Sequence, residues 1–375
     1  MKNKSFNTYL DFGSSQIRAT SFNKNDNDLS NLIESFCISI LDEKKLDLSE
    51  AETLIESIII DIEKKNDEHL NEIYLMIDSP NALSISLSIS KINDEIKLTK
   101  QHIEYLIQDA KQQIKSSYPD NEIIHIIIQN YQIDHVNYKF IPTNINCKKL
   151  SIDLLFICFQ KKFVNSINSL FKKYNVSVKK ILFCSYAKFV TYNEQFKNEK
   201  KVIFIDIGYE KTSIFLFLEG NLNFFKILPI GGNHITKDIS KILKIDEKKS
   251  EELKLNFDKP NYFSSHNSHS LELIKKIIFS RTEEILEISS KLLDELTPIK
   301  DVRFIVTGNG AKILDNSFKA NIKFSSNIDL LDEDSLEICK TGLSLIQGVN
   351  EHEVSIIPKR TSRKRLFERF FNLFQ

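Results

Sequence analysis

Two stretches of the chain repeat one order of apolar and polar positions. They read "TYLDFGSSQIRATSF" and "VIFIDIGYEKTSIFLF". In each, an apolar strand ends in Asp-x-Gly, a polar turn follows, and a second β-rich run begins. Asp11 of the first stretch corresponds to Asp206 of the second, 195 positions later. Because such self-similarity indicates an internal repeat, the pattern predicts two related halves.

Each polar turn is a candidate phosphate site. Glycine and small hydroxyl residues in a tight turn let backbone N–H groups close on a phosphate. An aspartate at the end of the strand can hold Mg²⁺, often through water. Two facing copies would clasp a triphosphate from both sides, whereas one copy alone is as well explained by an ordinary turn.

A third stretch, "VRFIVTGNGAKI", predicts a buried strand, a glycine-rich turn and the start of a helix. The turn contains Gly308, Asn309 and Gly310. Such a turn permits close approach of the backbone to a nucleoside or phosphate. The alternative is a strand–helix connection without a ligand.

Between these elements, "SEELKL" places Glu251 and Lys254 three residues apart. This spacing puts both side chains on one face of a helix. A solvated charge pair and a ligand-binding pair are both compatible with it.

The stretch from about 80 to 160 has a different pattern. "NALSISLSIS" alternates with period two, which predicts a strand. A helical stretch at 99–116 and two further strand-like runs follow. We therefore expect a small α+β unit inserted here.

Composition narrows the classes of function. The 375 residues carry 51 basic and 51 acidic side chains, so no global charge favours nucleic acid. No cysteine pair has C-x-x-C spacing, which gives no indication of zinc or disulfides. The N-terminus lacks the apolar core of a signal peptide, no stretch is long enough to span a bilayer, and we expect a cytoplasmic protein. The cysteines are Cys37, Cys147, Cys158, Cys184 and Cys339.

The two Asp-x-Gly turns and the later glycine-rich turn follow one another along the chain as the first phosphate loop, the second phosphate loop and the adenosine loop do in a known superfamily. They therefore resemble the ATPase superfamily of actin, the sugar kinases and the heat-shock chaperones. The finer resemblance is to the FtsA family of bacterial actin-like division proteins. "LPIGGNHITKDIS" is similar to the family's Gly-Asn-His-x-Thr-x-Asp segment, and "IIFSRTEEILEI" to its Arg-x-x-Glu-Ile helix. "IPTNINCKKLSIDLLFI" stands where the family has a Pro-x-Gly-Met-x-Gly-x-x-Leu run, without its glycines. The resemblance covers nearly the whole chain.

The resemblance implies an α/β, actin-like duplicated ATPase fold with an inserted small α+β subdomain and a C-terminal amphipathic helix. The implied parts are a first actin-like subdomain at 1–79 and 161–198, the insert at 80–160, a second-half core at 199–229 and 299–345, an outer partner-binding subdomain at 230–298, a linker at 346–362 and the amphipathic helix at 363–375.

The resemblance also implies a site for ATP and Mg²⁺. Asp11 and Asp206 would hold the metal through water. The residues carried over to the nucleotide site are Asp11, Gly13, Ser14, Ser15, Asp206, Gly208, Thr212, Gly232, Asn233, Glu251, Lys254, Gly308, Asn309 and Gly310.

Two features depart from the family pattern. Tyr209 and Glu210 replace small residues of the second phosphate loop, and Glu210 would put a negative charge where phosphates are expected. The segment "ILFCSYAKFV" before that loop offers no Glu or Gln to orient an attacking water. We therefore name no catalytic residue and expect at most a slow ATPase.

The last thirteen residues, "RKRLFERFFNLFQ", are basic and rich in phenylalanine. On a helix, one arc carries Leu366, Phe367, Phe370, Phe371, Leu373 and Phe374. Lys364, Arg365 and Arg369 lie on the other side. This pattern is typical of a helix lying in an anionic membrane surface. The alternative is a helix docked on the body of the protein.

Together these features predict a peripheral protein on the cytoplasmic side of the cell membrane, at the division site. By resemblance, it would anchor FtsZ filaments to the membrane, self-associate into filaments and help to recruit other division proteins. Arg281, with Lys275 and Lys276 beside it, is the candidate for binding the FtsZ C-terminal peptide, although pairing with Glu284 is the simpler role of Arg281. A pilus-assembly adaptor and a small-molecule kinase of the same superfamily are the alternatives.

Overall fold

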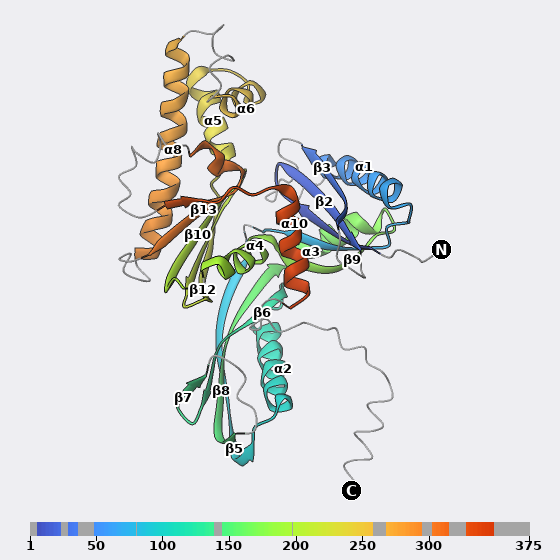
Figure 1. Ribbon diagram of the computed structural model, residues 1–375, viewed down its shortest axis with the longest axis vertical. Coiled ribbons are helices and arrows are strands. Elements are labelled where there is room, and N and C mark those ends of the chain that lie inside the picture. Colours follow the sequence, from blue (N-terminus) through green and yellow to red (C-terminus); the bar gives the residue numbers. More distant parts are fainter. Residues whose placement is uncertain are drawn as a thin grey trace.

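The computed structural model describes residues 6–23, 29–36, 49–79, 81–138, 145–196, 198–257, 268–294, 302–314 and 328–348. Two five-stranded sheets have the same strand order, β3-β2-β1-β4-β9 and β12-β11-β10-β13-β14 (Figure 1). In each, three antiparallel strands continue into two parallel ones. The repeat predicted from the two Asp-x-Gly stretches is therefore a repeat of whole sheets.

The strands of the first sheet are β1 (Phe6–Phe12), β2 (Gln16–Asn23), β3 (Leu29–Phe36), β4 (Glu72–Ile77) and β9 (Ser177–Phe183). Those of the second are β10 (Lys201–Ile207), β11 (Thr212–Leu218), β12 (Asn221–Leu228), β13 (Arg303–Thr307) and β14 (Ile328–Leu330). Asp11 lies in β1 opposite Arg18 of β2, and Asp206 lies in β10 opposite Ser213 of β11.

Helix α4 (Cys184–Asn193) lies where the two halves meet, and η1 (Glu194–Phe196) continues it. It packs against β9, β10, β11 and α10 (Ser335–Ile346) (Figure 1). Phe189 of α4 stacks on Phe204 of β10, with 4.8 Å between ring centroids, and meets Phe215 of β11 edge-on at 4.9 Å. One hydrophobic core therefore spans both halves. Helices α1 (Ser49–Asn66) and α3 (Lys161–Lys172) also belong to the first half.

The far side of the second sheet is covered by α8 (Ser268–Asp294), whose Ile285 and Leu286 pack against β10 and β11. The other part of α8 forms a helical lobe with α5 (Gly232–Leu243) and α6 (Glu247–Leu255) (Figure 1). We call α5, α6 and this part of α8 the outer lobe. The 3₁₀ helix η2 (Asn309–Ile313) follows β13.

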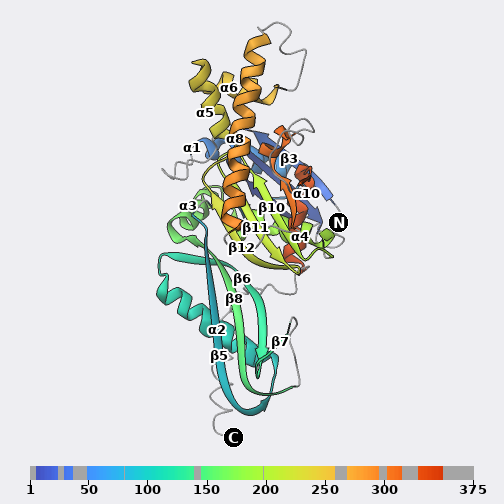
Figure 2. The same cartoon turned by 90° about the vertical axis from the view of Figure 1, so that its left-hand side faces the viewer.

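The inserted unit is a four-stranded antiparallel sheet of order β5-β8-β6-β7 with α2 (Lys100–Ser117) on one face, and it extends away from both halves (Figure 2). Its strands are β5 (Leu83–Lys97), β6 (Asn121–Ile133), β7 (Val136–Tyr138) and β8 (Asn146–Gln160). The alternating run predicted as a strand lies in β5, and its serines are exposed. The helix predicted at 99–116 is α2.

Among the residues in these ranges, no helix is long and apolar enough to cross a membrane. The membrane residues Lys364, Arg365, Leu366, Phe367, Arg369, Phe370, Phe371, Leu373 and Phe374 lie outside the described residues, as does 349–362 of the linker.

Candidate functional site

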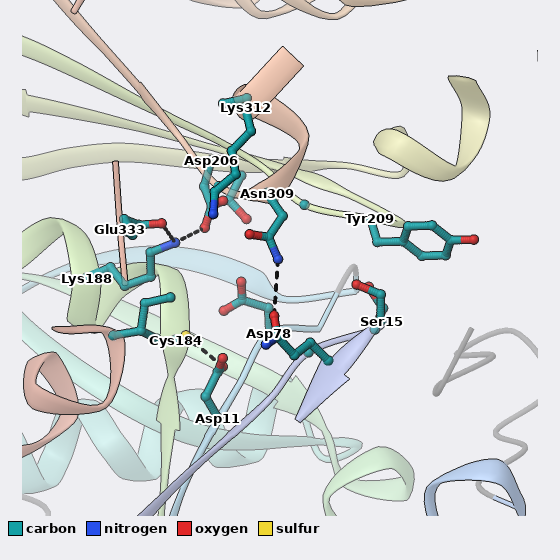
Figure 3. Close-up of a pocket in the computed structure, with 18 of the residues that line it drawn as sticks. Asp11, Ser15, Asp78, Cys184, Lys188, Asp206, Tyr209, Asn309, Lys312 and Glu333 are labelled. Atoms are coloured by element: carbon teal, nitrogen blue, oxygen red, sulfur yellow. Dashed lines mark hydrogen bonds and ion pairs between the residues drawn. The ribbon is translucent and has the colours of Figure 1, made fainter. Parts of the chain in front are cut away.

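A pocket of about 400 Å³ lies between the two halves of the fold. The turn after β1, the turn after β10 and the turn after β13 all border it (Figure 3). Eight of the predicted nucleotide residues line this pocket: Asp11, Gly13, Ser14, Ser15, Asp206, Gly208, Gly308 and Asn309. The sequence repeat thus brings the predicted loops to a single cavity.

The first two turns have the same backbone hydrogen bond. The Gly13 N–H donates to the Gln16 carbonyl at 3.0 Å, and the Gly208 N–H donates to the Lys211 carbonyl at 2.9 Å. In both turns the glycine lies two residues after the strand's aspartate. The two loops are therefore structural copies, which supports an origin by duplication.

The first aspartate of the pocket is bound by two side chains. Arg18 Nη1 donates to Asp11 Oδ2, and Cys184 Sγ donates to Asp11 Oδ1 at 3.2 Å. Burial by itself would lower the pKa of Arg18, but the Asp11 carboxylate outweighs it and raises that pKa. Burial, reinforced by Asp11, raises the pKa of the Cys184 thiol well above its ordinary value. Asp11 therefore faces a cation and a protonated thiol.

The second aspartate is also paired with a cation. Lys188 Nζ of α4 lies 2.5 Å from Asp206 Oδ2 and 2.9 Å from Glu333 Oε2. Lys188 is only 4% exposed. Burial disfavours its charge, but the two carboxylates outweigh burial and raise its pKa well above the ordinary value. The buried ammonium is charged and is shared between two acids (Figure 3).

These pairings decide whether the pocket fits Mg²⁺. A water-mediated metal site needs the carboxylates of Asp11 and Asp206 free to face the ion. Each already has a cationic partner, and a metal would have to displace Arg18 and Lys188 or be repelled by them. Within the described ranges, no group of three or more His, Cys, Asp or Glu side chains is arranged to hold a metal. The prediction of Mg²⁺ on these aspartates does not fit this arrangement.

Six predicted nucleotide residues do not line the pocket: Thr212, Gly232, Asn233, Glu251, Lys254 and Gly310. Thr212 Oγ1 donates to the Ile230 carbonyl at 2.7 Å. Gly310 packs so closely on Ile207 that a Cβ there would lie 2.5 Å from Ile207 Cγ2. Thr212 and Gly310 therefore pack within the protein next to the loops and do not face the pocket.

The Glu251–Lys254 pair predicted from its spacing is formed, with 2.6 Å between Oε2 and Nζ. It is not solvated, because the two residues are only 4% and 5% exposed. Lys254 Nζ also donates to Thr236 Oγ1 at 2.9 Å and to the Gly232 carbonyl at 3.1 Å. Burial lowers the pKa of Lys254, and Glu251 offsets part of that effect. The pair holds α5 against α6.

The two unusual residues of the second loop have different surroundings. Tyr209 lines the pocket, and its ring centroid is 5.3 Å from Lys254 Nζ. It therefore lies between the pocket and the Glu251–Lys254 pair. Glu210 accepts a hydrogen bond from Asn233 Nδ2 at 2.7 Å and does not line the pocket. The Glu210 carboxylate, which was expected to lie among the phosphates, therefore faces Asn233 and not the pocket.

Several pocket residues were not predicted from the sequence. Besides Arg18, Lys188 and Glu333, they include Asp78, which accepts hydrogen bonds from the Ser185 N–H at 2.8 Å and from Ser185 Oγ. The signal for Lys188 was present, since it is the only charged residue of the stretch 181–193. A lone lysine in such a stretch must find a buried partner or point to solvent.

The candidate partner residues lie on α8 in the outer lobe. Arg281 Nε donates to Asp238 Oδ2 at 2.7 Å, and Nη1 donates to Glu284 Oε2 at 2.6 Å. The simpler pairing with Glu284 is therefore present, and Asp238 of α5 adds a second partner. Lys275 is partly buried and Lys276 is exposed.

Comparison with known proteins identifies two matching family models. The model described as "Cell division protein FtsA" matches residues 203–363. The model described as "SHS2 domain inserted in FTSA" matches residues 84–158, which lie in the inserted unit. The two matches do not overlap, and they fall on the second half and on the insert.

Curated relatives agree with these models. The cell division protein FtsA of Streptococcus pneumoniae serotype 2 (strain D39 / NCTC 7466) is 24% identical over 302 residues, covering 79% of this chain and 64% of the relative. The cell division protein FtsA of Bacillus subtilis (strain 168) is 22% identical over 287 residues, covering 70% of this chain and 65% of the relative. The chain thus spans less than two thirds of the length of these relatives.

Among solved structures, a "PilM-PilN type IV pilus biogenesis complex" matches with a TM-score of 0.62 and 12% identity. The match covers 92% of this chain and 99% of that one. At this identity the likeness concerns the fold alone, which is a mixed α/β actin-like ATPase fold with an inserted SHS2 subdomain.

Proposed function

Since the chain belongs to the FtsA family of cell division proteins, we propose that it anchors FtsZ filaments to the inner face of the cytoplasmic membrane and helps to recruit other division proteins. The observation that carries this proposal is the SHS2 unit inserted between β4 and β9 of an actin-like fold, together with the FtsA match over the second half. Self-association of the actin-like body into filaments is part of the proposal.

The membrane contact is assigned to the C-terminal residues 363–375. Burying six large apolar side chains gains at most about 9–18 kcal/mol, at roughly 1.5–3 kcal/mol each. Partial insertion and the ordering of a short helix offset much of this gain. One tail should therefore bind reversibly, whereas several tails on one filament bind far more tightly, because later contacts become intramolecular.

The test is flotation with anionic vesicles in the presence of purified FtsZ. We expect the full chain to carry FtsZ to the vesicles and a chain ending at Ser362 to leave it in solution, since the truncation removes the apolar face. Neutral vesicles serve as a control, because anionic lipid attracts the basic residues of the tail. If both chains stay in solution with anionic vesicles, the tail is docked on the protein and the tether proposal fails.

The pilus-type adaptor is a second candidate, favoured by the fold likeness to the PilM–PilN structure. The same flotation experiment separates the two. A chain that floats alone and leaves FtsZ behind would keep the membrane contact and favour the adaptor.

The outer lobe is proposed as the FtsZ-binding surface, with Arg281 as its main contact. A basic group suits a peptide with acidic character. We expect Arg281→Ala to weaken peptide binding by about tenfold or more, since hydrogen bonds to charged groups contribute about 1.5–3 kcal/mol. Lys276→Ala should weaken it by less than about fivefold, because exposed charge pairs contribute about 0.2–1 kcal/mol. Fluorescence anisotropy with a labelled peptide measures both.

The matched control for these variants is Lys291→Ala, ten residues further along α8. Lys291 is 78% exposed and pairs only loosely with Glu287, at 3.9 Å. The Lys291→Ala variant should bind the peptide as tightly as the unaltered chain does. Unchanged binding by Arg281→Ala would mean that Arg281 serves only to join α8 to Asp238, and the surface would have to be sought elsewhere.

The cleft is proposed as a nucleotide site. Two copied glycine turns and the turn at Gly308 border one pocket, which supports a ligand with phosphate groups. Tyr209 lies between this pocket and Glu251 and Lys254, which the resemblance assigns to the nucleotide site. Because the stretch 181–190 before the second loop contains no Glu or Gln to orient an attacking water, we propose that the chain is at most a slow ATPase.

A further inference from the structure

Several side chains bridge the cleft between the two halves. Lys188 of α4 belongs to the first half, and its partners Asp206 and Glu333 belong to the second. Lys211 of the second half donates to the Asp78 carbonyl of the first at 2.5 Å. Asn309 Nδ2 of the second half donates to Gln16 Oε1 of the first at 3.3 Å.

We propose that Lys188 is a built-in cation that closes this cleft in place of a bound divalent metal. Its ammonium contacts the carboxylates of both Asp206 and Glu333. By the family resemblance, Asp206 would instead bind the metal through water. Arg18 neutralises Asp11 in the same way. The closed cleft, and any ligand that enters it, then requires no divalent cation.

The charge arrangement supports this assignment over a chance surface contact. Lys188, Asp206 and Glu333 have side chains that are 5%, 13% and 4% exposed. Solvent therefore screens their attraction very little. Two nearby carboxylates would repel each other if the ammonium between them were absent. A hard metal ion at such a site would likewise place one cation between two carboxylates.

The position of Lys188 gives the contact a mechanical role. It stands one residue before Phe189, whose ring packs on Phe204 and Phe215 of the second half. The apolar contact and the ion pairs therefore hold the same turn of α4 against the same sheet. The assignment concerns the cleft alone and holds whether or not the chain binds FtsZ.

The experiment compares the full chain with Lys188→Met in a thermal melt, with EDTA and with increasing Mn²⁺ as the probe. The unaltered chain should have the same Tm in both conditions. Lys188→Met should melt lower by roughly 5 °C or more, because two buried carboxylates lose their partner. Mn²⁺ should then raise the Tm of Lys188→Met, by binding between Asp206 and Glu333.

Two further variants make the test specific. Lys312→Met removes a lysine from the same pocket that is 59% exposed and 4.0 Å from Asp332, and it should behave like the unaltered chain. Adding Asp206→Asn to Lys188→Met should abolish the effect of Mn²⁺. A rise in the Tm of the double variant as large as that of Lys188→Met would place the Mn²⁺ elsewhere and overturn the assignment.

The proposal is overturned if Mn²⁺ or Mg²⁺ raises the Tm of the unaltered chain and Asp206→Asn removes that rise, since the aspartate would then hold a metal. It is also overturned if Lys188→Met folds and melts like the unaltered chain. If Lys188→Met does not fold, the comparison of the unaltered chain with Asp206→Asn still decides the question.

Discussion

Replacement of Gly308 by alanine should lower the free energy of unfolding by about 2–6 kcal/mol. Gly308 has a φ of +92° and a ψ of 163°, a combination that is almost confined to glycine and costs other residues about 1–3 kcal/mol. A Cβ there would also overlap the carboxylate of Asp206 and lie 2.6 Å from the Ile207 carbonyl. Overpacking of this kind costs about 1–3 kcal/mol. Urea unfolding measures the sum.

Gly220→Ala is the matched control. Gly220 has a φ of +86°, but nothing lies within 4 Å of a Cβ built on it. It should therefore show only the backbone cost of about 1–2 kcal/mol. Equal losses in the two variants would mean that Asp206 and its ion pair with Lys188 move aside freely, contrary to the tight packing around this turn.

Phe189→Ala should lower the free energy of unfolding by about 3–5 kcal/mol, the usual cost of removing a buried phenylalanine. The ring is fully buried on α4 and contacts Phe204 and Phe215, so its loss leaves a cavity between the two halves. Guanidinium unfolding followed by tyrosine fluorescence and by far-UV circular dichroism measures the change. Earlier exposure of tyrosine than loss of secondary structure would indicate that the halves separate first.

Tyr105→Ala provides the comparison for this variant. Tyr105 is an aromatic residue on α2 that is 51% exposed. Surface substitutions usually change stability by less than about 0.5 kcal/mol. A loss at Phe189 no larger than at Tyr105 would contradict a core shared by the two halves.

The repeat and the insert could be predicted because each follows from a local pattern of residues in the sequence. Asp-x-Gly at the end of an apolar strand fixes a turn, and alternation with period two fixes the exposed serines of β5. The pairings in the cleft could not be predicted in this way. Lys188 and Glu333 are far apart in sequence, and only the tertiary fold brings α4 to the segment after β14. Long-range ion pairs leave no periodicity.

The pair Glu251–Lys254 illustrates an intermediate case. Its spacing was enough to predict the contact, since residues three apart share a helix face. Its burial depends on Thr236 and Tyr209, which come from other elements. Local spacing therefore predicts which charged residue is the partner, but it does not predict how deeply the ion pair is buried.

The inserted sheet has a consequence for how force passes through the molecule. Strands β6 and β8 contribute to two cores at once: Ile127 and Leu155 pack in the main core, whereas Ile126 and Leu154 pack in the core of the insert. His125 Nε2 also accepts the Phe183 N–H at 2.9 Å, next to the start of α4. Both strands continue through this junction, where β6 shifts register against β8 between Ile123 and His125 and between Ile128 and Asn130. Because the insert shares these strands with the main core, and its β5 of 15 residues is about 50 Å long, we expect a displacement of its tip to be passed on to the start of α4.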